Sequence, residues 1–277
     1  MTGPIMIPLQ GPADAAVALP IARRLAELEG VPIHVIHVAH EAATSLDVVE
    51  RLGMTAIELR GSVLDTRAGE AGPAIVATAD ELAAGSIVMC TRTPGLGAAE
   101  PVGVTALEVL RSSPCPVFFL APRPAIDNWG PRRILLPHDG TPATSAAVRP
   151  AADLARRSSA DLDILHVASP ESQGPVERGG FAPPRYMDQP QHEWPAWTGE
   201  FIERLGCICD LASLRVRMSF ASGTPGMEVL RFADTNATDL IVLGWRGEWG
   251  GGHAATIKAI VGRTTLPVMV VRAPAVS

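Results

Sequence analysis

The feature that most constrains this chain is an internal repeat. The segment Ile5–Pro8 returns as Ile134–Pro137, and Ile36–Val38 returns as Leu165–Val167, with the same offset of 129 residues. Further on, the apolar run that ends at Cys90 has its counterpart at Gly244, where the offset has grown to 154 residues. A long unit that occurs twice predicts two duplicated domains rather than a solenoid, and a chain of 277 residues fits two domains.

The boundaries between these domains follow from composition. The proline-rich stretch Pro122–Pro131 is typical of a linker, so we expect a first domain over residues 1–124 and a second over residues 131–277. The extra residues of the second half map to Ser169–Trp197, a stretch rich in proline and glycine. This composition predicts a long inserted loop.

Each half alternates short apolar runs with helical patterns. In the first half, Ile5–Leu9 and Ile33–Ala39 have the pattern of buried strands, and Ala13–Glu29 between them has that of a helix. Strands that alternate with helices predict an α/β fold, a doubly wound parallel sheet with helices on both faces. Ligands bind such sheets beyond the carboxyl ends of the strands. In the second half these ends lie near Asp139, Val167 and Gly244.

A glycine-rich stretch runs from Gly244 to Gly252, between a predicted strand and a helix predicted over Thr256–Arg263. Glycines let backbone N–H groups approach a phosphate closely, and a helix N-terminus behind them favours anions. Neither GxxxxGK[ST] nor GxGxxG is present. Alone, such a stretch is more often a mobile connection than a phosphate site.

Taken in order, these motifs resemble the universal stress protein family. In the second half they are Ile134–Gly140, Leu165–Val167, Asp239–Gly247 and Leu266–Val271, and in the first half Asp80–Arg92 and Gly103–Leu120. The resemblance covers nearly the whole chain except Ser169–Trp197. It implies a stress-response regulatory protein with five strands per domain in the order 3-2-1-4-5. It also implies that the two domains pair through their last strands as a pseudo-dimer, either alone or within a homodimer.

The resemblance also implies a nucleotide site in the second domain. Members of the family that bind ATP carry Gly-x2-Gly-x9-Gly-Ser/Thr after the fourth strand and an Asp at the end of the first. By that likeness Asp139 would hold the adenine or ribose edge of the nucleotide, and the backbone of two glycines would approach the ribose and phosphates. The full set of expected nucleotide-binding residues is Pro137, Asp139, Val167, Leu243, Gly244, Gly247 and Thr256.

Both halves depart from the family pattern. In the second, only six residues separate Gly247 from Ala254, which stands where Gly is expected, and Glu248 brings a negative charge close to the phosphates. In the first half Gln10 replaces the Asp, and Cys90 and Thr93 replace the first two glycines. We therefore expect any adenine nucleotide to bind in the second domain alone.

Two hypotheses stay open. In the first, the second domain binds ATP or another adenine nucleotide weakly, as its one cofactor, and occupancy signals the state of the cell. In the second, both sites have decayed and the chain is a ligand-free dimerising interaction scaffold. An enzyme is not expected, because no pair of nucleophile and general base, no Gly-x-Ser-x-Gly and no His-Glu-x-x-His can be found. No metal site is expected either.

Charge, apolar runs and cysteine content indicate which kinds of partner and which cellular compartment to expect. A net charge of −6 without a run of Lys or Arg argues against nucleic acid. Absence of a signal peptide and of about 18 consecutive apolar residues argues against export and against a membrane span. Four cysteines without paired CxxC motifs are expected to be free thiols in a reducing compartment, which predicts a cytoplasmic protein.

Three smaller predictions concern individual side chains. His37 and His166 occupy matching strand positions and should be hydrogen-bonded core residues rather than catalytic ones. Asp161 and Asp163 should be solvated surface charges. The aromatic part of the inserted loop, near Trp197, should form either a lid for a partner or a cover for its own sheet.

Overall fold

The computed structural model describes residues 3–39, 45–55, 59–91, 102–122, 128–168, 180, 190–248 and 252–274. The chain divides into two compact units. The first consists of Met1–Gly130 with Val261–Val270, and the second of Pro131–Ile260 with Val271–Ser277.

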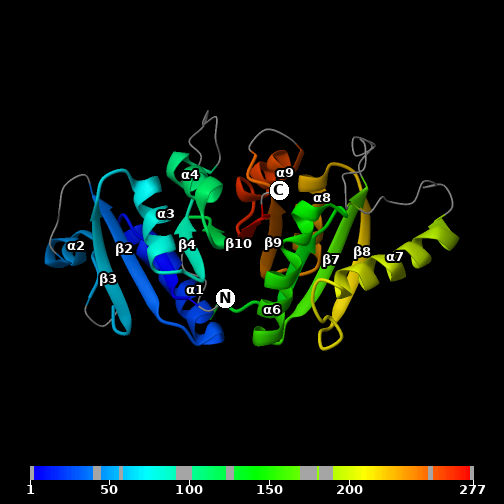
Figure 1. Ribbon diagram of the computed structural model, residues 1–277, viewed down its shortest axis with the longest axis horizontal. Helices are drawn as coiled ribbons and strands as arrows, with labels where there is room; N and C mark the ends of the chain where they lie inside the picture. The colour runs from blue at the N-terminus through cyan, green and yellow to red at the C-terminus, as the bar shows by residue number, and fades with distance from the viewer. Residues whose placement is uncertain are drawn as a thin grey trace. The chain divides into compact units, whose positions relative to one another are not determined.

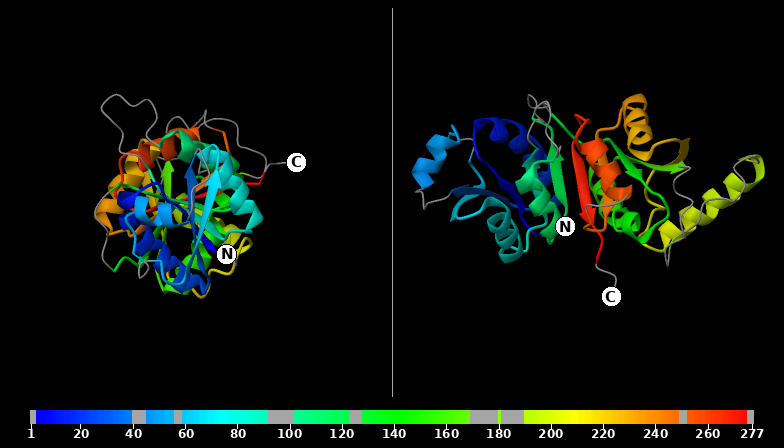
Figure 2. Two further views of the ribbon diagram at one scale, coloured as in Figure 1. Left: turned by 90° about the vertical axis from the view of Figure 1, so that its left-hand side faces the viewer. Right: turned by 90° about the horizontal axis from the view of Figure 1, so that it is seen from above.

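The first unit is a doubly wound α/β structure (Figures 1 and 2). Its parallel strands have the order β3-β2-β1-β4-β5, which confirms the predicted order. Helix α1 lies on the opposite face of the sheet from α3 and α4 (Figure 2). The elements are β1 (Ile5–Pro8), α1 (Pro12–Glu29), β2 (Ile33–Ala39), α2 (Ser45–Arg51), β3 (Ser62–Ala68), α3 (Ala71–Glu81), β4 (Ser86–Cys90), α4 (Val104–Ser112) and β5 (Val117–Leu120).

A further strand of the first unit comes from the end of the chain. In β10 (Val268–Arg272), the residues Val268–Val270 belong to this unit and pair antiparallel with Val117–Phe119 of β5. Both runs are apolar and fully buried. This pairing covers an edge of β5 that would otherwise expose unpaired backbone groups.

The core of the first unit lies between its sheet and its helices. Alternate residues of β1 and β4 face opposite sides of the sheet, and Ile5, Ile7 and Ile87 are fully buried. Helix α1 runs unbroken through Pro20, and Gly30 ends it in the left-handed conformation at φ 67°. The helix therefore begins at Pro12, ahead of this proline, and continues through it to Glu29.

The second unit repeats the plan. Its parallel strands have the order β8-β7-β6-β9, the counterpart of β3-β2-β1-β4, and α7 and α8 lie on opposite faces of the sheet (Figure 2). The elements are β6 (Arg133–Pro137), α5 (Pro142–Ser145), α6 (Val148–Ser158), β7 (Asp161–Ala168), α7 (Pro190–Gly206), β8 (Val216–Ser222), α8 (Pro225–Thr235), β9 (Leu240–Trp245) and α9 (Gly252–Val261).

Helix α7 corrects the prediction of a loop over Ser169–Trp197. Residues from Pro190 onward are helical, because a proline is tolerated in the first turn of a helix and an apolar stripe follows it. Trp197, Phe201 and Leu205, spaced four residues apart, are all buried. Residues 169–179 and 181–189 of the predicted loop lie outside the described residues.

The predicted role of the strand histidines is confirmed. Nδ1 of His37 lies 2.8 Å from the Leu9 carbonyl oxygen, and Nδ1 of His166 lies 3.0 Å from the His138 carbonyl oxygen. Both rings are buried. Leu9 and His138 are also 129 residues apart, so the same side-chain bond fixes the end of the first strand in each unit.

The prediction for Asp163 is wrong. Its side chain is 3% exposed and accepts two hydrogen bonds from the Arg217 guanidinium, both at 2.9 Å. The two residues face each other across β7 and β8 in the strand register. A buried carboxylate needs such a partner. The partner was not predicted because Arg217 lies 54 residues further along the chain. Asp161 remains about one-third exposed, beside Arg215.

The four cysteines are free thiols in the described structure. Among the helices that the structure describes, none is long and apolar enough to cross a membrane.

Candidate functional site

The candidate site lies at the carboxyl end of β6. This strand pairs with β7 on one side and with β9 on the other, so the ends of three parallel strands meet at the point where the strand order reverses. Ligands of doubly wound proteins bind at this point. Pro137 ends β6, Val167 lies near the end of β7, and Leu243 and Gly244 lie near the end of β9.

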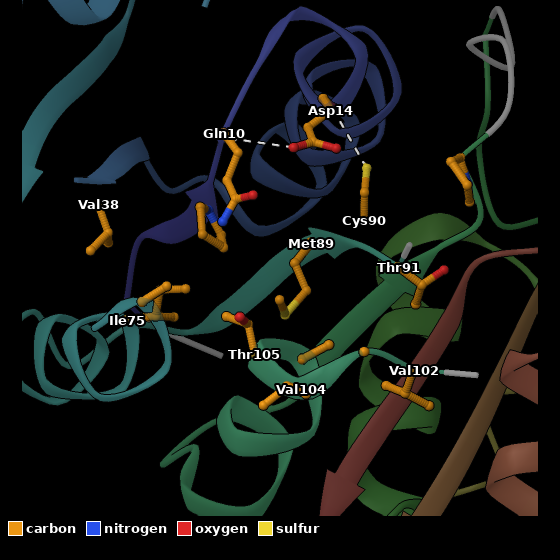
Figure 3. A pocket seen from close by; sticks show the side chains of 15 residues that line it. Gln10, Asp14, Val38, Ile75, Met89, Cys90, Thr91, Val102, Val104 and Thr105 are labelled. Atoms are coloured by element: carbon orange, nitrogen blue, oxygen red, sulfur yellow. Dashed lines mark hydrogen bonds between the residues drawn. The ribbon is translucent and has the colours of Figure 1, made fainter. Parts of the chain in front are cut away.

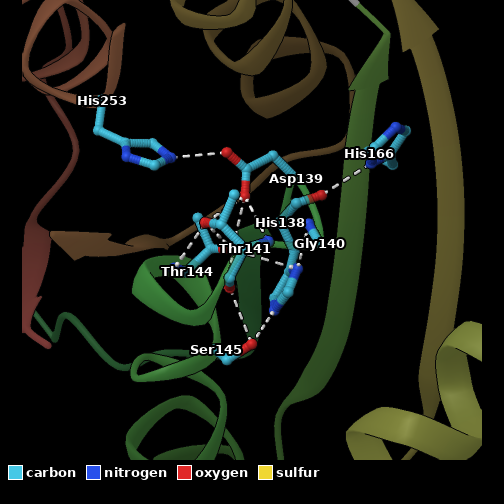
Figure 4. Close-up of polar contacts among 8 residues, drawn as sticks. All are labelled: His138, Asp139, Gly140, Thr141, Thr144, Ser145, His166 and His253. Carbon is cyan, nitrogen blue, oxygen red and sulfur yellow. Dashed lines mark hydrogen bonds and ion pairs between the residues drawn. The ribbon is translucent and has the colours of Figure 1, made fainter. Parts of the chain in front are cut away.

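Asp139 organises the turn that follows β6 (Figure 4). Its Oδ1 atom accepts hydrogen bonds from the Thr141 backbone N–H at 2.9 Å, from the Thr141 hydroxyl at 2.7 Å and from the Thr144 hydroxyl at 2.8 Å. These bonds form an Asx turn that leads into α5. One oxygen of the carboxylate is therefore fully used within the protein.

The second oxygen of Asp139 meets a residue from a distant part of the chain. Its Oδ2 lies 2.6 Å from Nε2 of His253, in the first turn of α9. The pair is reachable by solvent, with 42% of the Asp139 side chain and 28% of the His253 side chain exposed. Burial acts to raise the pKa of Asp139. The His253 hydrogen bond and charge, with the Thr141 hydrogen bonds, outweigh that effect and hold the pKa well below its usual value.

His138 is a fixed neutral group beneath this turn. The Gly140 backbone N–H donates to its Nδ1 at 3.0 Å, and the Ser145 hydroxyl lies 3.3 Å from its Nε2. Since a backbone N–H can only donate, Nδ1 is the acceptor and the proton of the neutral ring sits on Nε2. Burial lowers the His138 pKa to about 4, against a smaller opposing effect of Asp139. His138 is thus structural, and the sequence analysis did not single it out.

Gly244 has a packing reason to be glycine. A Cβ at this position would lie 2.2 Å from the Ala143 carbonyl oxygen and 2.7 Å from the Thr144 Cα. These are backbone atoms of α5, so the helix rests directly on β9. Gly247 has a conformational reason, because its φ of +95° is strained for other residues. Both glycines are therefore explained without a ligand, although their backbones still line the end of β9.

The start of α9 differs from the prediction. The helix begins at Gly252 rather than at Thr256, so His253 and not Thr256 occupies its first turn. A run of Ala and His after glycines is itself compatible with helix. The sequence analysis did not single out His253, because its partner Asp139 is distant in the chain. A histidine just after a glycine-rich stretch was the available signal.

Of the remaining predicted residues, Val167 and Leu243 are apolar and buried. Val167 is 9% exposed and Leu243 is 4% exposed. Thr256 lies one turn further along α9, half-buried. The structure thus brings Asp139 together with His253, and sets Pro137, Val167, Leu243 and Gly244 at neighbouring strand ends.

The aromatic side chains of α7 cover the sheet beside this site. Trp197 stacks on Phe201 with 4.8 Å between the ring centroids, and also lies 4.8 Å from the His166 ring and 5.6 Å from that of Phe220. Since His166 and Phe220 belong to β7 and β8, the helix covers its own sheet. Of the two alternatives for Trp197, this is the one that the structure supports.

The chain thus has the architecture of a tandem doubly wound α/β protein, with a carboxylate at the switch point of its second unit. The family model described as "Universal stress protein family" matches residues 130–272. The chain belongs to the universal stress protein family. None of the curated proteins gives a significant match.

Solved structures show the same fold over the full length of the chain. A universal stress protein from Archaeoglobus fulgidus is 18% identical, with a TM-score of 0.69, and the match covers 99% of this chain and 98% of that one. Two Pseudomonas aeruginosa proteins, one functionally unknown and one a putative universal stress protein, are each 16% identical with TM-scores of 0.61. These matches cover 97% and 96% of this chain, and 92% of each of the others.

Proposed function

We propose that this chain is a stress-response regulatory protein whose second unit binds ATP or another adenine nucleotide weakly. The observation that carries the proposal is the state of Asp139. Its Oδ2 atom stands at the switch point of the sheet and, among the described residues, is bonded to His253 alone. A hydroxyl or amino group of a nucleotide can reach this oxygen by replacing the imidazole. The lost imidazole contact offsets part of the gain, which is why binding is weak.

The other residues have supporting roles in this proposal. Val167 and Leu243 offer apolar contacts to the base, and Pro137 shapes the end of β6. The backbones of Gly244 and Gly247 lie along the path of the ribose and phosphates, with Thr256 the nearest hydroxyl. Glu248 follows Gly247 in the chain and is exposed, so its negative charge would disfavour phosphates near these glycines.

Isothermal titration of the full chain with ATP tests the proposal. Asp139→Ala removes the acceptor and should weaken binding about 5- to 150-fold, the equivalent of about 1–3 kcal/mol. His253→Ala removes the competitor and should tighten binding. Gln10→Ala, the matching change in the first unit, should leave binding unchanged. Tight binding that ignores both Asp139 and His253, or two equivalent sites per chain, would contradict the proposal.

The alternative function is a ligand-free interaction scaffold in which the two domains form a pseudo-dimer. One observation favours it: Thr141, Thr144 and His253 already bind both carboxylate oxygens of Asp139. If ATP binds neither the wild type nor His253→Ala, the scaffold is the better explanation. Solution scattering would then test the pairing of the domains, which should give one compact particle rather than two separated ones.

A further inference from the structure

The first unit contains a cavity of about 660 Å³ at the carboxyl ends of β1, β2 and β4 (Figure 3). Small-molecule sites usually measure roughly 300–1,000 Å³. Strand β1 pairs with β2 and β4, so this cavity occupies the switch point of the first sheet. The sequence gives no reason to expect a nucleotide here, and the cavity has no assigned occupant.

The charge of the cavity is set by one side chain. Among its described lining residues, Asp14 is the single charged group, and no Lys, Arg or His joins it. Oδ2 of Asp14 accepts a hydrogen bond from the Gln10 backbone N–H at 3.3 Å. Its Oδ1 atom accepts none from any residue within the described ranges. A carboxylate oxygen at the edge of this cavity is therefore available to a hydrogen-bond donor.

The neighbouring polar groups support a donor rather than an anion. The Cys90 thiol lies 3.7 Å from the Asp14 backbone oxygen, and burial, with a further effect of Asp14, raises its pKa to about 12, so the thiol is neutral. The Gln10 side chain offers an amide that both donates and accepts. A phosphate would meet the Asp14 charge here with no basic side chain to offset it.

One feature of the cavity favours an acceptor on the ligand as well. Gly103, the N-cap residue of α4, provides no side-chain cap for the first N–H groups of this helix, and residues of its first turn line the cavity. This partial positive charge suits a carbonyl or ring nitrogen. It is small beside the full charge of Asp14.

The remaining wall is apolar. Val38, Ile75 and Met89 line the cavity between the Gln10 and Asp14 side chains and the start of α4 (Figure 3). A flat apolar body fits against such side chains while a polar head reaches the carboxylate.

We propose that the first unit binds a small organic molecule with an N–H donor head group, of amide or amidine type, on an apolar body and without negative charge. The head group donates to Oδ1 of Asp14, and the body packs on Val38, Ile75 and Met89. This site is separate from the nucleotide site proposed for the second unit, and neither depends on the other.

Three probes of equal shape test the charge requirement: benzamidine, benzamide and benzoate. The readout is the methyl resonance of Met89 in full-length protein labelled with ¹³C-methyl methionine, assigned through Met89→Leu. Benzamidine and benzamide should shift this resonance saturably, and benzoate at the same concentration should not. Equal or tighter binding of benzoate, or no shift with any of the probes, would overturn the proposal.

Two variants place the ligand in the cavity. Asp14→Asn keeps an acceptor for the Gln10 N–H but loses the charge, and should weaken benzamidine binding about tenfold or more. Thr105→Trp fills the cavity from α4 and should abolish the Met89 shift. Asp139→Asn, in the second unit, is the matched control and should leave the benzamidine-induced shift of the Met89 resonance unchanged. If Asp14→Asn and Thr105→Trp both leave benzamidine binding intact, the proposed site is wrong, whatever the outcome of the ATP titration.

Discussion

Replacing Gly244 by alanine separates packing from ligand binding at the end of β9. The added Cβ would lie 2.2 Å from the Ala143 carbonyl oxygen, whereas non-bonded heavy atoms prefer about 3.5–4.0 Å. Helix α5 must therefore retreat by more than about 1 Å, which also disturbs the Thr144 hydroxyl bonded to Asp139. Overpacking of this kind costs about 1–3 kcal/mol.

The assay is urea unfolding in the absence of any ligand. With a denaturant slope near 2 kcal/mol/M, Gly244→Ala should lower the midpoint of the second unit by roughly 0.5–1.5 M. Gly199→Ala is the control, because no atom lies within 4 Å of a Cβ at this exposed position in α7. It should stabilise the unit by about 0.5–1 kcal/mol. If Gly244→Ala leaves the midpoint unchanged but weakens ATP binding, the glycine serves the ligand and the packing argument is wrong.

Three further predictions concern the second unit. The pKa of Asp139 is lowered in the folded chain, so its stabilising contribution is fully present above the unfolded value of about 4 and is lost only as the pH falls through the lower folded-state pKa. The midpoint gap between wild type and Asp139→Asn should therefore narrow steadily from roughly pH 5 to pH 2, and a gap that stays constant or widens over this range would contradict the assignment. Burial lowers the pKa of His138 to about 4, so as the pH falls the unfolded chain binds this proton before the folded chain does. The free energy of unfolding should therefore decrease by up to about 1.4 kcal/mol per pH unit as the pH falls from roughly 6 to 4. His138→Gln should flatten that slope in the same urea series. Trp197→Ala should cost about 3–5 kcal/mol, measured by thermal unfolding, and a loss below about 1 kcal/mol would show that α7 is not part of the core.

The repeat made most of the fold predictable. Strand positions followed from short apolar runs such as Ile134–Pro137, because such runs must be buried on both faces of a parallel sheet. The hydrogen bonds of His37 and His166 were predictable for the same reason, since a buried imidazole needs a partner and a strand offers carbonyl groups.

The failures share a physical cause, which is that the decisive partner lies far away in sequence. Asp163 was assigned to the surface because Arg217 is 54 residues away. His253 was overlooked because its partner Asp139 is 114 residues away. Helix α7 was missed because prolines near its start outweighed the apolar spacing of Trp197 and Phe201. Local patterns give elements, whereas pairs across the fold require the structure.

The two units differ most at the switch points of their sheets, and they differ there in opposite directions. The second unit has the carboxylate and the glycines of the family pattern, yet Thr141, Thr144 and His253 already bind that carboxylate. The first unit has Gln10 in place of the carboxylate, and an open cavity with an available oxygen on Asp14. Motif residues report which atoms could contact a ligand, whereas free volume and unused hydrogen-bonding groups report whether there is room for one. Judged by free volume and unused hydrogen-bonding groups, the first unit, which departs further from the family motif, is the better candidate for a ligand. The Asp14 carboxylate at its cavity disfavours the phosphate that the family motif would bind.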